Sequence, residues 1–290
     1  MKSKKENFKE LRRFFINAFV NAEISLTEIE NFFQNYLEYI FNLNNLNLDN
    51  FDIQISKVQF DERHPKREKK YKSWANQEIR SLIKRRILSK PCFKPNCADF
   101  YFDAMMQAHD TLPNKFNIWI NKNSCHARND EEIQDLIFLF NSFAHEVHHI
   151  IQYITRPKEM DRYDYLSSLH NVYIEHAEEI ASNKREAKKL KRTINQHLQI
   201  LFSNCKPEQF ADKKAFDYLD ILFNEILNSL PPVNTIEEHL FMTFIRTLQI
   251  RNMNLYASRF YDYEITELKY GDSTNRLTNF PVEADLLEIN

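Results

Sequence analysis

The sequence predicts an α+β fold that is predominantly α-helical, with a small antiparallel or mixed sheet. Long stretches lack Pro and Gly and carry apolar residues at helical spacing, while three short stretches have the character of β-strands. The 290 residues include one glycine, Gly271, which leaves few tight turns with positive φ and excludes a Gly-rich phosphate-binding loop. A content of 43% hydrophobic and 13% aromatic residues is typical of a folded chain with a large core.

We expect one domain over residues 1–290. Its central core covers about 51–204, and helical extensions at about 1–48 and about 205–290 flank that core. Residues 6–43 predict two helices, the second beginning near Ser25-Leu26-Thr27-Glu28. The Asn-rich stretch after them predicts a loop, and the alternation of Phe51–Ile55 predicts a strand. Residues 61–90 are rich in Lys and Arg, most simply a solvated face that ends in a helix.

Two further strands are predicted before the most informative helix. They cover residues 99–106 and 115–121, and the Asp110–Asn114 turn between them favours an antiparallel hairpin. After that helix, the pattern predicts a long helical segment from about Tyr165 to Phe202. Further helices follow at residues 210–230 and 235–250, separated by Pro231-Pro232, and residues 255–263 fit a helix or a strand.

The most informative stretch is the helix expected from Glu131 to Tyr153. It contains His145, Glu146 and His149 in the spacing His-Glu-x-x-His. Residues i and i+4 share one face of a helix, so both imidazoles can point at one metal ion, with the glutamate beside it. The other interpretation is that both histidines are hydrogen-bonded core residues. Two histidines at this spacing beside a glutamate on an apolar helix favour metal binding.

This motif resembles that of the zincins, a group of zinc-dependent peptidases. The resemblance implies a zincin-like core and one Zn²⁺ per chain, held by His145, His149 and a third residue. It also implies that zinc activates a water molecule and that Glu146 accepts its proton before the attack on a peptide carbonyl. The expected reaction is cleavage of a protein or peptide substrate, by an endopeptidase rather than an exopeptidase.

The third zinc ligand is expected on a following helix. The astacin and matrix-protease pattern would place Gly and His where this chain has Gln152 and Thr155, so that branch is rejected. Gluzincins instead take a glutamate from a segment often written Glu-x-x-Ala-Asp. Glu178-Glu179-Ile180-Ala181-Ser182 matches it except at the last position, which makes Glu178 the expected ligand. Glu175 and Glu179 are the alternative ligands, or residues that orient a histidine.

Two other roles follow from the resemblance. An oxyanion donor is expected among nearby tyrosines and histidines, with Tyr173 and His170 the main candidates and Tyr163, Tyr165 and His176 also near in sequence. The strand before the active helix commonly lines up the substrate backbone in zincins. That implies a substrate strand at Asn117, Ile118, Trp119, Ile120 and Asn121, with an ordinary core strand as the equal alternative.

Charge and targeting signals limit the partners and the cellular location that we expect. The net charge is −2, which disfavours nucleic acid as a partner, and no apolar run approaches the ~18 residues of a membrane span. No signal peptide is evident. The four cysteines form no disulfide framework and have no strong metal-binding spacing. A structural zinc would recruit residues from Cys92, Cys97, Cys125 and His126. We expect a cytoplasmic regulatory peptidase, similar to the ImmA/IrrE kind, or an effector delivered into a host cytosol. The competing class is a non-catalytic protein-binding module that uses its basic faces.

Overall fold

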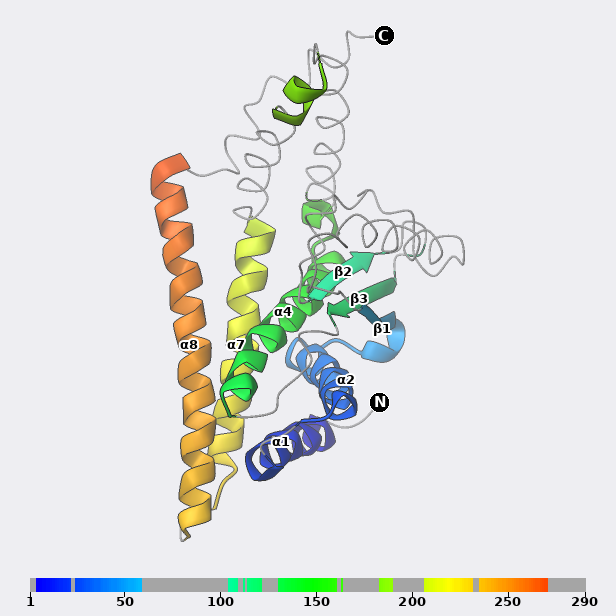
Figure 1. The fold of residues 1–290 in the computed structure, drawn as a ribbon. Helices are drawn as coiled ribbons and strands as arrows, with labels where there is room; N and C mark the ends of the chain where they lie inside the picture. Colours follow the sequence, from blue (N-terminus) through cyan, green and yellow to red (C-terminus); the bar gives the residue numbers. More distant parts are fainter. Residues whose placement is uncertain are drawn as a thin grey trace.

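A computed structural model describes residues 4–21, 24–58, 104–108, 112, 114–121, 130–160, 163, 183–189, 206–231 and 235–270. Within these residues the chain is mostly helical and carries one small mixed sheet, so the predicted α+β class is confirmed (Figure 1). The predicted helix from Tyr165 to Phe202 and the basic stretch at 61–90 lie outside the described residues, apart from a short helical segment at 184–189.

The two N-terminal helices have the predicted positions. Helix α1 covers Lys4–Asn21 and α2 covers Leu26–Leu43. Ser25 caps α2: its side chain accepts a hydrogen bond from the Glu28 N–H, and the Glu28 carboxylate accepts one from the Ser25 N–H at 2.9 Å. After α2 the chain turns at Asn45, whose φ is 56°, a left-handed conformation that asparagine adopts in this glycine-poor chain.

The sheet contains three strands in the order β1-β3-β2. Strand β1 (Asp52–Val58) pairs in parallel with β3 (Lys115–Asn121), and β2 (Ala104–Ala108) pairs antiparallel with β3, which confirms the predicted antiparallel pairing of the second and third strands. Strand β3 is therefore the central strand, and its backbone is hydrogen-bonded on both sides. This corrects the prediction of a substrate strand at Asn117–Asn121, because a peptide can add only to a free sheet edge. The residues form a core strand.

Helix α4 (Asp130–Thr155) lies at the centre of the molecule and carries the motif, as predicted. It packs against α2 on one side, the two helices α7 and α8 on another, and strands β2 and β3 (Figure 1). Aromatic residues fix its contact with α2: Phe140 stacks on Phe32 at a centroid distance of 4.2 Å, and Phe143 lies 4.5 Å from Phe33. This packing holds the face of α4 that carries the histidines toward α7.

Two long helices complete the fold. Helix α7 covers Lys206–Asn228, and α8 covers Ile236–Tyr270 as one continuous helix that includes residues 255–263, for which helix and strand were both open. A buried polar link joins three helices: the Asn141 side-chain amide of α4 donates to Asn252 Oδ1 of α8 at 2.8 Å, and the Asn252 amide donates to the Phe216 carbonyl of α7 at 3.1 Å. The helices are thereby fixed in register around α4.

The hydrophobic core of the described residues is continuous across the central segment and the N- and C-terminal helices. Buried residues of α1, α2, α4, α7 and α8 form one cluster together with those of the sheet. The segments expected as extensions are thus packed on the motif helix itself. Among the described helices, none combines the length and the apolar character needed to cross a membrane.

Candidate metal centre

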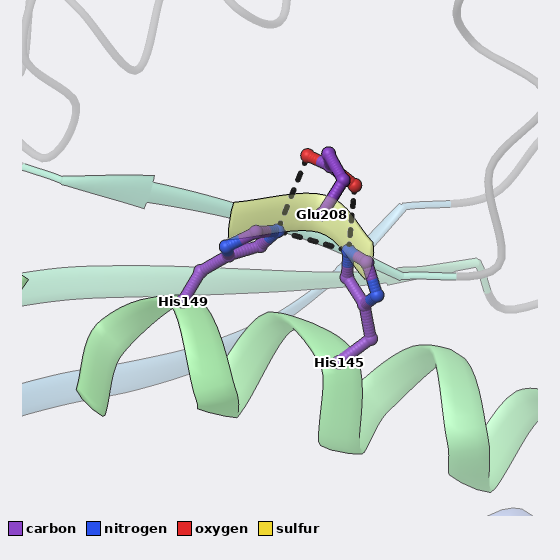
Figure 2. A group of neighbouring side chains, drawn as sticks. All are labelled: His145, His149 and Glu208. Atoms are coloured by element: carbon purple, nitrogen blue, oxygen red, sulfur yellow. Dashed lines mark hydrogen bonds and ion pairs between the residues drawn. The ribbon is translucent and has the colours of Figure 1, made fainter. Parts of the chain in front are cut away.

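The helical spacing of the motif brings two imidazoles together, as predicted. His145 and His149 lie one turn apart on α4, and their Nε2 atoms are 2.9 Å from each other (Figure 2). His149 is 2% exposed, and the side chain of His145 is 13% exposed. The two rings therefore meet in a nearly closed space between α4 and α7.

A carboxylate from α7 completes the group. Glu208, in the first turn of α7, places Oε2 at 3.1 Å from His145 Nε2 and Oε1 at 3.3 Å from His149 Nε2 (Figure 2). His145, His149 and Glu208 are the described residues that gather as a possible metal-binding group. The segment that carries the carboxylate was predicted as part of a C-terminal extension.

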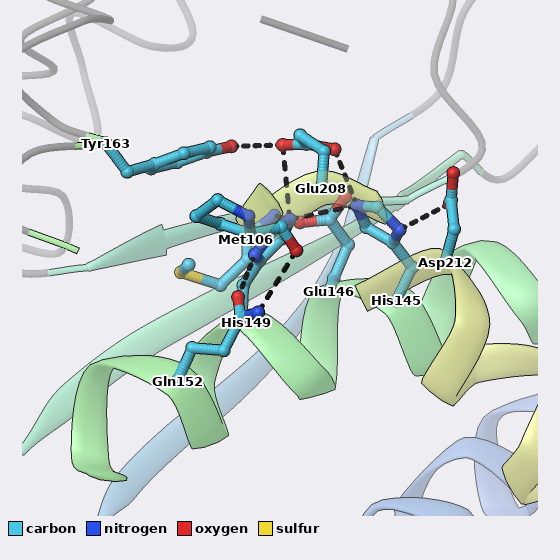
Figure 3. Close-up of polar contacts among 9 residues, drawn as sticks. Met106, His145, Glu146, His149, Gln152, Tyr163, Glu208 and Asp212 are labelled. Carbon is cyan, nitrogen blue, oxygen red and sulfur yellow. Dashed lines mark hydrogen bonds and ion pairs between the residues drawn. The ribbon is translucent and has the colours of Figure 1, made fainter. Parts of the chain in front are cut away.

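The outer nitrogen of each ring is already engaged. His145 Nδ1 lies 2.7 Å from Asp212 Oδ1, and His149 Nδ1 lies 2.8 Å from Gln152 Oε1 (Figure 3). Both partners are oxygen acceptors, so each Nδ1 carries a proton and donates it. In the neutral rings both Nε2 atoms then hold lone pairs that face each other and the Glu208 carboxylate. A positive charge is required between these acceptors, either a proton on one ring or a metal ion.

The pKa values of the group follow from the same arrangement. Burial alone would lower the pKa of His145, but the carboxylates of Glu208 and Asp212 outweigh it and hold that pKa well above 6.5. Burial would raise the pKa of Glu208, but the two neighbouring histidines hold it well below 4.5. The metal-free centre is therefore a buried ion pair between a protonated His145 and an ionised Glu208.

Glu146 lies next to this group and contacts the sheet. Its Oε2 accepts a hydrogen bond from the Met106 N–H of β2 at 2.7 Å (Figure 3). Burial raises the pKa of Glu146 above 4.5, against the opposing effect of the two histidines. Strand β2 is an edge of the described sheet, so Glu146 lies where the motif helix meets that edge.

Tyr163 reaches the centre from the segment after α4. Its hydroxyl donates a hydrogen bond to Glu208 Oε1, and its ring lies 5.4 Å from the ring of His149 (Figure 3). Tyr163 was one of the residues considered as an oxyanion donor. In this structure it holds one oxygen of Glu208.

His148, the third histidine of the motif helix, faces away from the group. Its Nδ1 lies 2.7 Å from the Tyr218 hydroxyl of α7, and the residue is 4% exposed. Burial, followed by the neighbouring His149 and His145, lowers the pKa of His148 to about 3. This ring is neutral and belongs to the contact between α4 and α7.

The other predicted site residues lie outside the described residues. They are the expected ligand Glu178, its alternatives Glu175 and Glu179, the oxyanion candidates Tyr173, His170, Tyr165 and His176, and the alternative zinc residues Cys92, Cys97, Cys125 and His126. Among the residues that the structure describes, the carboxylate beside both histidines is Glu208.

A sequence signal for Glu208 was present and was missed. Glu208-Gln209-Phe210-Ala211-Asp212 matches the Glu-x-x-Ala-Asp pattern at every position, including the final Asp that the segment at Glu178 lacks. In the structure, each of the three fixed positions of this pattern has a physical role. Glu208 faces both histidines, Asp212 orients His145, and Ala211 is fully buried where a larger side chain would separate α7 from α4.

Comparison of this chain with protein-family models, with curated proteins and with solved structures gave no match.

Proposed function

We propose that this chain is a zinc-dependent hydrolase that cleaves peptide bonds, with zinc held by His145, His149 and Glu208. One observation carries the proposal: three acceptor groups, one buried and two nearly so, converge while both outer ring nitrogens are already hydrogen-bonded. Two histidines and one glutamate leave a fourth zinc position for water or substrate, the composition of a catalytic rather than a structural zinc site. The Glu-x-x-Ala-Asp match at Glu208 adds to the resemblance to gluzincins.

The spacing of the donor atoms suits zinc. Bonds of roughly 2.0–2.1 Å in a tetrahedron place two ligand atoms roughly 3.3 Å apart. The two Nε2 atoms are 2.9 Å apart, and each lies 3.1 or 3.3 Å from a different oxygen of Glu208, so a small outward shift of the histidines would admit an ion beside the carboxylate. Asp212 and Gln152 hold both rings in the tautomer that zinc binding needs.

Glu146 is the proposed general base. A zinc ion at this position would act as a Lewis acid toward a water molecule and a carbonyl oxygen. Glu146 lies beside the two histidines, and burial raises its pKa, which makes the carboxylate a stronger base than an exposed glutamate. Its hydrogen bond to the Met106 N–H fixes the orientation of the carboxylate.

The proposed substrate is an extended peptide that approaches along β2. Strand β2 is an edge of the sheet that the described residues form, and its Met106 N–H donates to Glu146. An extended peptide would approach along this side of β2, where it would meet the Glu146 carboxylate. This moves the substrate strand from β3 to β2 and places the peptide next to the base, as an endopeptidase requires.

The competing proposal is a protein that binds a partner without catalysis. The buried ion pair between His145 and Glu208 favours it, because one proton can satisfy the same acceptors that a metal ion would bind. In that case the motif stabilises the contact between α4 and α7 and holds no metal. Metal content separates the two proposals.

The first experiment measures zinc by elemental analysis in the wild type, Glu208→Ala and Glu178→Ala. We expect about one zinc per chain in the wild type, little in Glu208→Ala, and a wild-type level in Glu178→Ala, which serves as the matched control. Zinc lost from Glu178→Ala and kept in Glu208→Ala would transfer the third ligand to Glu178. A wild type that binds no zinc after reconstitution would refute the metal site.

The second experiment tests catalysis with Glu146→Gln on a mixed peptide library. We expect this variant to bind zinc like the wild type and to lose peptide cleavage, because the amide cannot accept the proton. Equal cleavage by both proteins would show that Glu146 is not the base.

A further inference from the structure

We propose that Gln152 is a positioning residue that connects the orientation of His149 to the docking of α7. The inference rests on the proposed metal site and assigns a role to a residue outside the His-Glu-x-x-His motif. In this arrangement the first two turns of α7 supply one ligand and set the orientation of the other two.

The Gln152 side chain makes two hydrogen bonds in opposite directions. Its Oε1 lies 2.8 Å from His149 Nδ1, and its Nε2 donates to the Pro207 carbonyl oxygen at 3.0 Å. Gln152 is 3% exposed, so water does not compete freely for either bond. One amide therefore bridges α4 and the first turn of α7.

The carbonyl of Pro207 determines which way this amide points. A carbonyl oxygen only accepts hydrogen bonds, so the amide nitrogen of Gln152 must face Pro207, and its oxygen must then face His149. That oxygen accepts the Nδ1 proton and leaves the lone pair on His149 Nε2, the atom that faces His145 and Glu208. The position of one backbone carbonyl thus selects the histidine tautomer.

The two histidines are oriented from the same helix by different routes. Asp212 of α7 contacts His145 directly, whereas Pro207 of α7 acts on His149 through Gln152. Pro207 directly precedes Glu208, so a displacement of this turn moves the ligand and releases the bridging amide at the same time. We infer that the metal-binding geometry exists only when α7 is docked against α4.

The test compares the zinc affinity of the wild type, Gln152→Met and Gln152→Glu by competition with a chromogenic chelator. Gln152→Met removes both hydrogen bonds at similar volume, and we expect zinc affinity to fall roughly 10- to 100-fold. Gln152→Glu keeps an acceptor for His149 but replaces the donor to Pro207 with a carboxylate oxygen. We expect a smaller loss, several-fold or more.

Gln249→Met is the matched control. Gln249 of α8 donates through Nε2 to Asp220 Oδ1 of α7 at 2.7 Å, so it also bridges α7 to a neighbouring helix. Asp220 lies 12 residues after Glu208, roughly 18 Å along the helix at 1.5 Å per residue. We expect Gln249→Met to bind zinc like the wild type. A loss equal to that of Gln152→Met would mean that any weakening of α7 packing lowers the affinity, and it would overturn a specific role for Gln152.

Hydrogen exchange in the metal-free proteins tests the hydrogen bond from Gln152 to the Pro207 carbonyl without relying on zinc. We expect faster exchange in the first two turns of α7, residues 206–212, in both Gln152 variants, and unchanged exchange in α2. Wild-type zinc affinity in either Gln152 variant, or unchanged exchange at 206–212, would overturn the proposal. A wild type that binds no zinc would instead refute the proposed function, and the exchange result would still report whether Gln152 anchors α7.

Discussion

Zinc binding to the metal-free protein should release close to one proton per chain at pH 7, and the proton should come from His145. The carboxylates of Glu208 and Asp212 hold the pKa of His145 well above 6.5, so the metal-free ring is protonated at neutral pH. Glu208, whose pKa is well below 4.5, is already ionised and contributes no proton. A metal ion cannot bind His145 Nε2 until that proton leaves.

The size of the effect follows from linkage. While His145 is protonated in the metal-free protein, each unit rise in pH should strengthen zinc binding about tenfold, about 1.4 kcal/mol. The dependence holds while His145 is protonated in the metal-free protein, and it ends when the pH passes the raised pKa of His145. Beyond that point the affinity should become independent of the His145 proton.

Isothermal titration calorimetry in buffers of different ionisation enthalpy measures the protons released. Asp212→Asn removes a negative charge beside His145, which lowers the pKa of the ring and should reduce the proton release at pH 7. Ser25→Ala is the control, because Ser25 caps α2 and the change leaves in place the three carboxylates that raise the His145 pKa, those of Glu208, Asp212 and Glu146. Zinc binding with no proton release between pH 7 and 8 would show that His145 is neutral in the metal-free protein, and the reasoning about the buried ion pair would be refuted.

Three further substitutions test the packing that supports the site. Ser25→Ala removes the α2 cap and should lower the free energy of unfolding by about 1 kcal/mol in urea denaturation, without affecting zinc affinity. Ala211→Leu should cost roughly 1–3 kcal/mol by overpacking the contact between α4 and α7, and it should also weaken zinc binding; unchanged affinity would show that Glu208 tolerates a displaced helix. Tyr218→Phe removes the hydroxyl that contacts His148 and should cost roughly 1–3 kcal/mol of stability. Zinc affinity should stay at the wild-type level, because His148 faces away from His145, His149 and Glu208.

Local patterns predicted much of this fold because local forces determine it. The capping box at Ser25 and Glu28 marks the start of α2, and the apolar periodicity of residues 131–153 predicts most of α4. The predicted strands at 51–55 and 115–121 match β1 and β3, and the one predicted at 99–106 overlaps β2 at residues 104–106. Their order could not be predicted, because it depends on pairing between β1 and β3, which are distant in sequence. The substrate-strand prediction failed for this reason: a buried central strand and an exposed edge strand can have the same local pattern.

Local sequence patterns could predict that the two histidines lie together, but not which acidic segment lies beside them. His145 and His149 are one helical turn apart, so the helix alone brings them together. Asp212 is 67 residues from His145, and only the packing of α7 on α4 joins them. The full Glu-x-x-Ala-Asp match at Glu208 was readable from the sequence, but the partial match at Glu178 was preferred, and that segment lies outside the described residues. Tertiary packing, including the buried Ala211, decides which acidic segment can reach the histidines.

The position of Glu208 in α7 has a consequence for the order in which the candidate metal centre assembles during synthesis. Ribosomes release the chain from its N-terminus, so both histidines of α4 emerge before the carboxylate of α7. A nascent chain that ends before residue 206 has the proposed base and two ligands, but it lacks Glu208 and the Asp212 and Pro207 contacts that orient the rings. If the centre is a peptidase, its chemistry is therefore delayed until α7 is made and docked, and unfinished chains are protected from a premature protease.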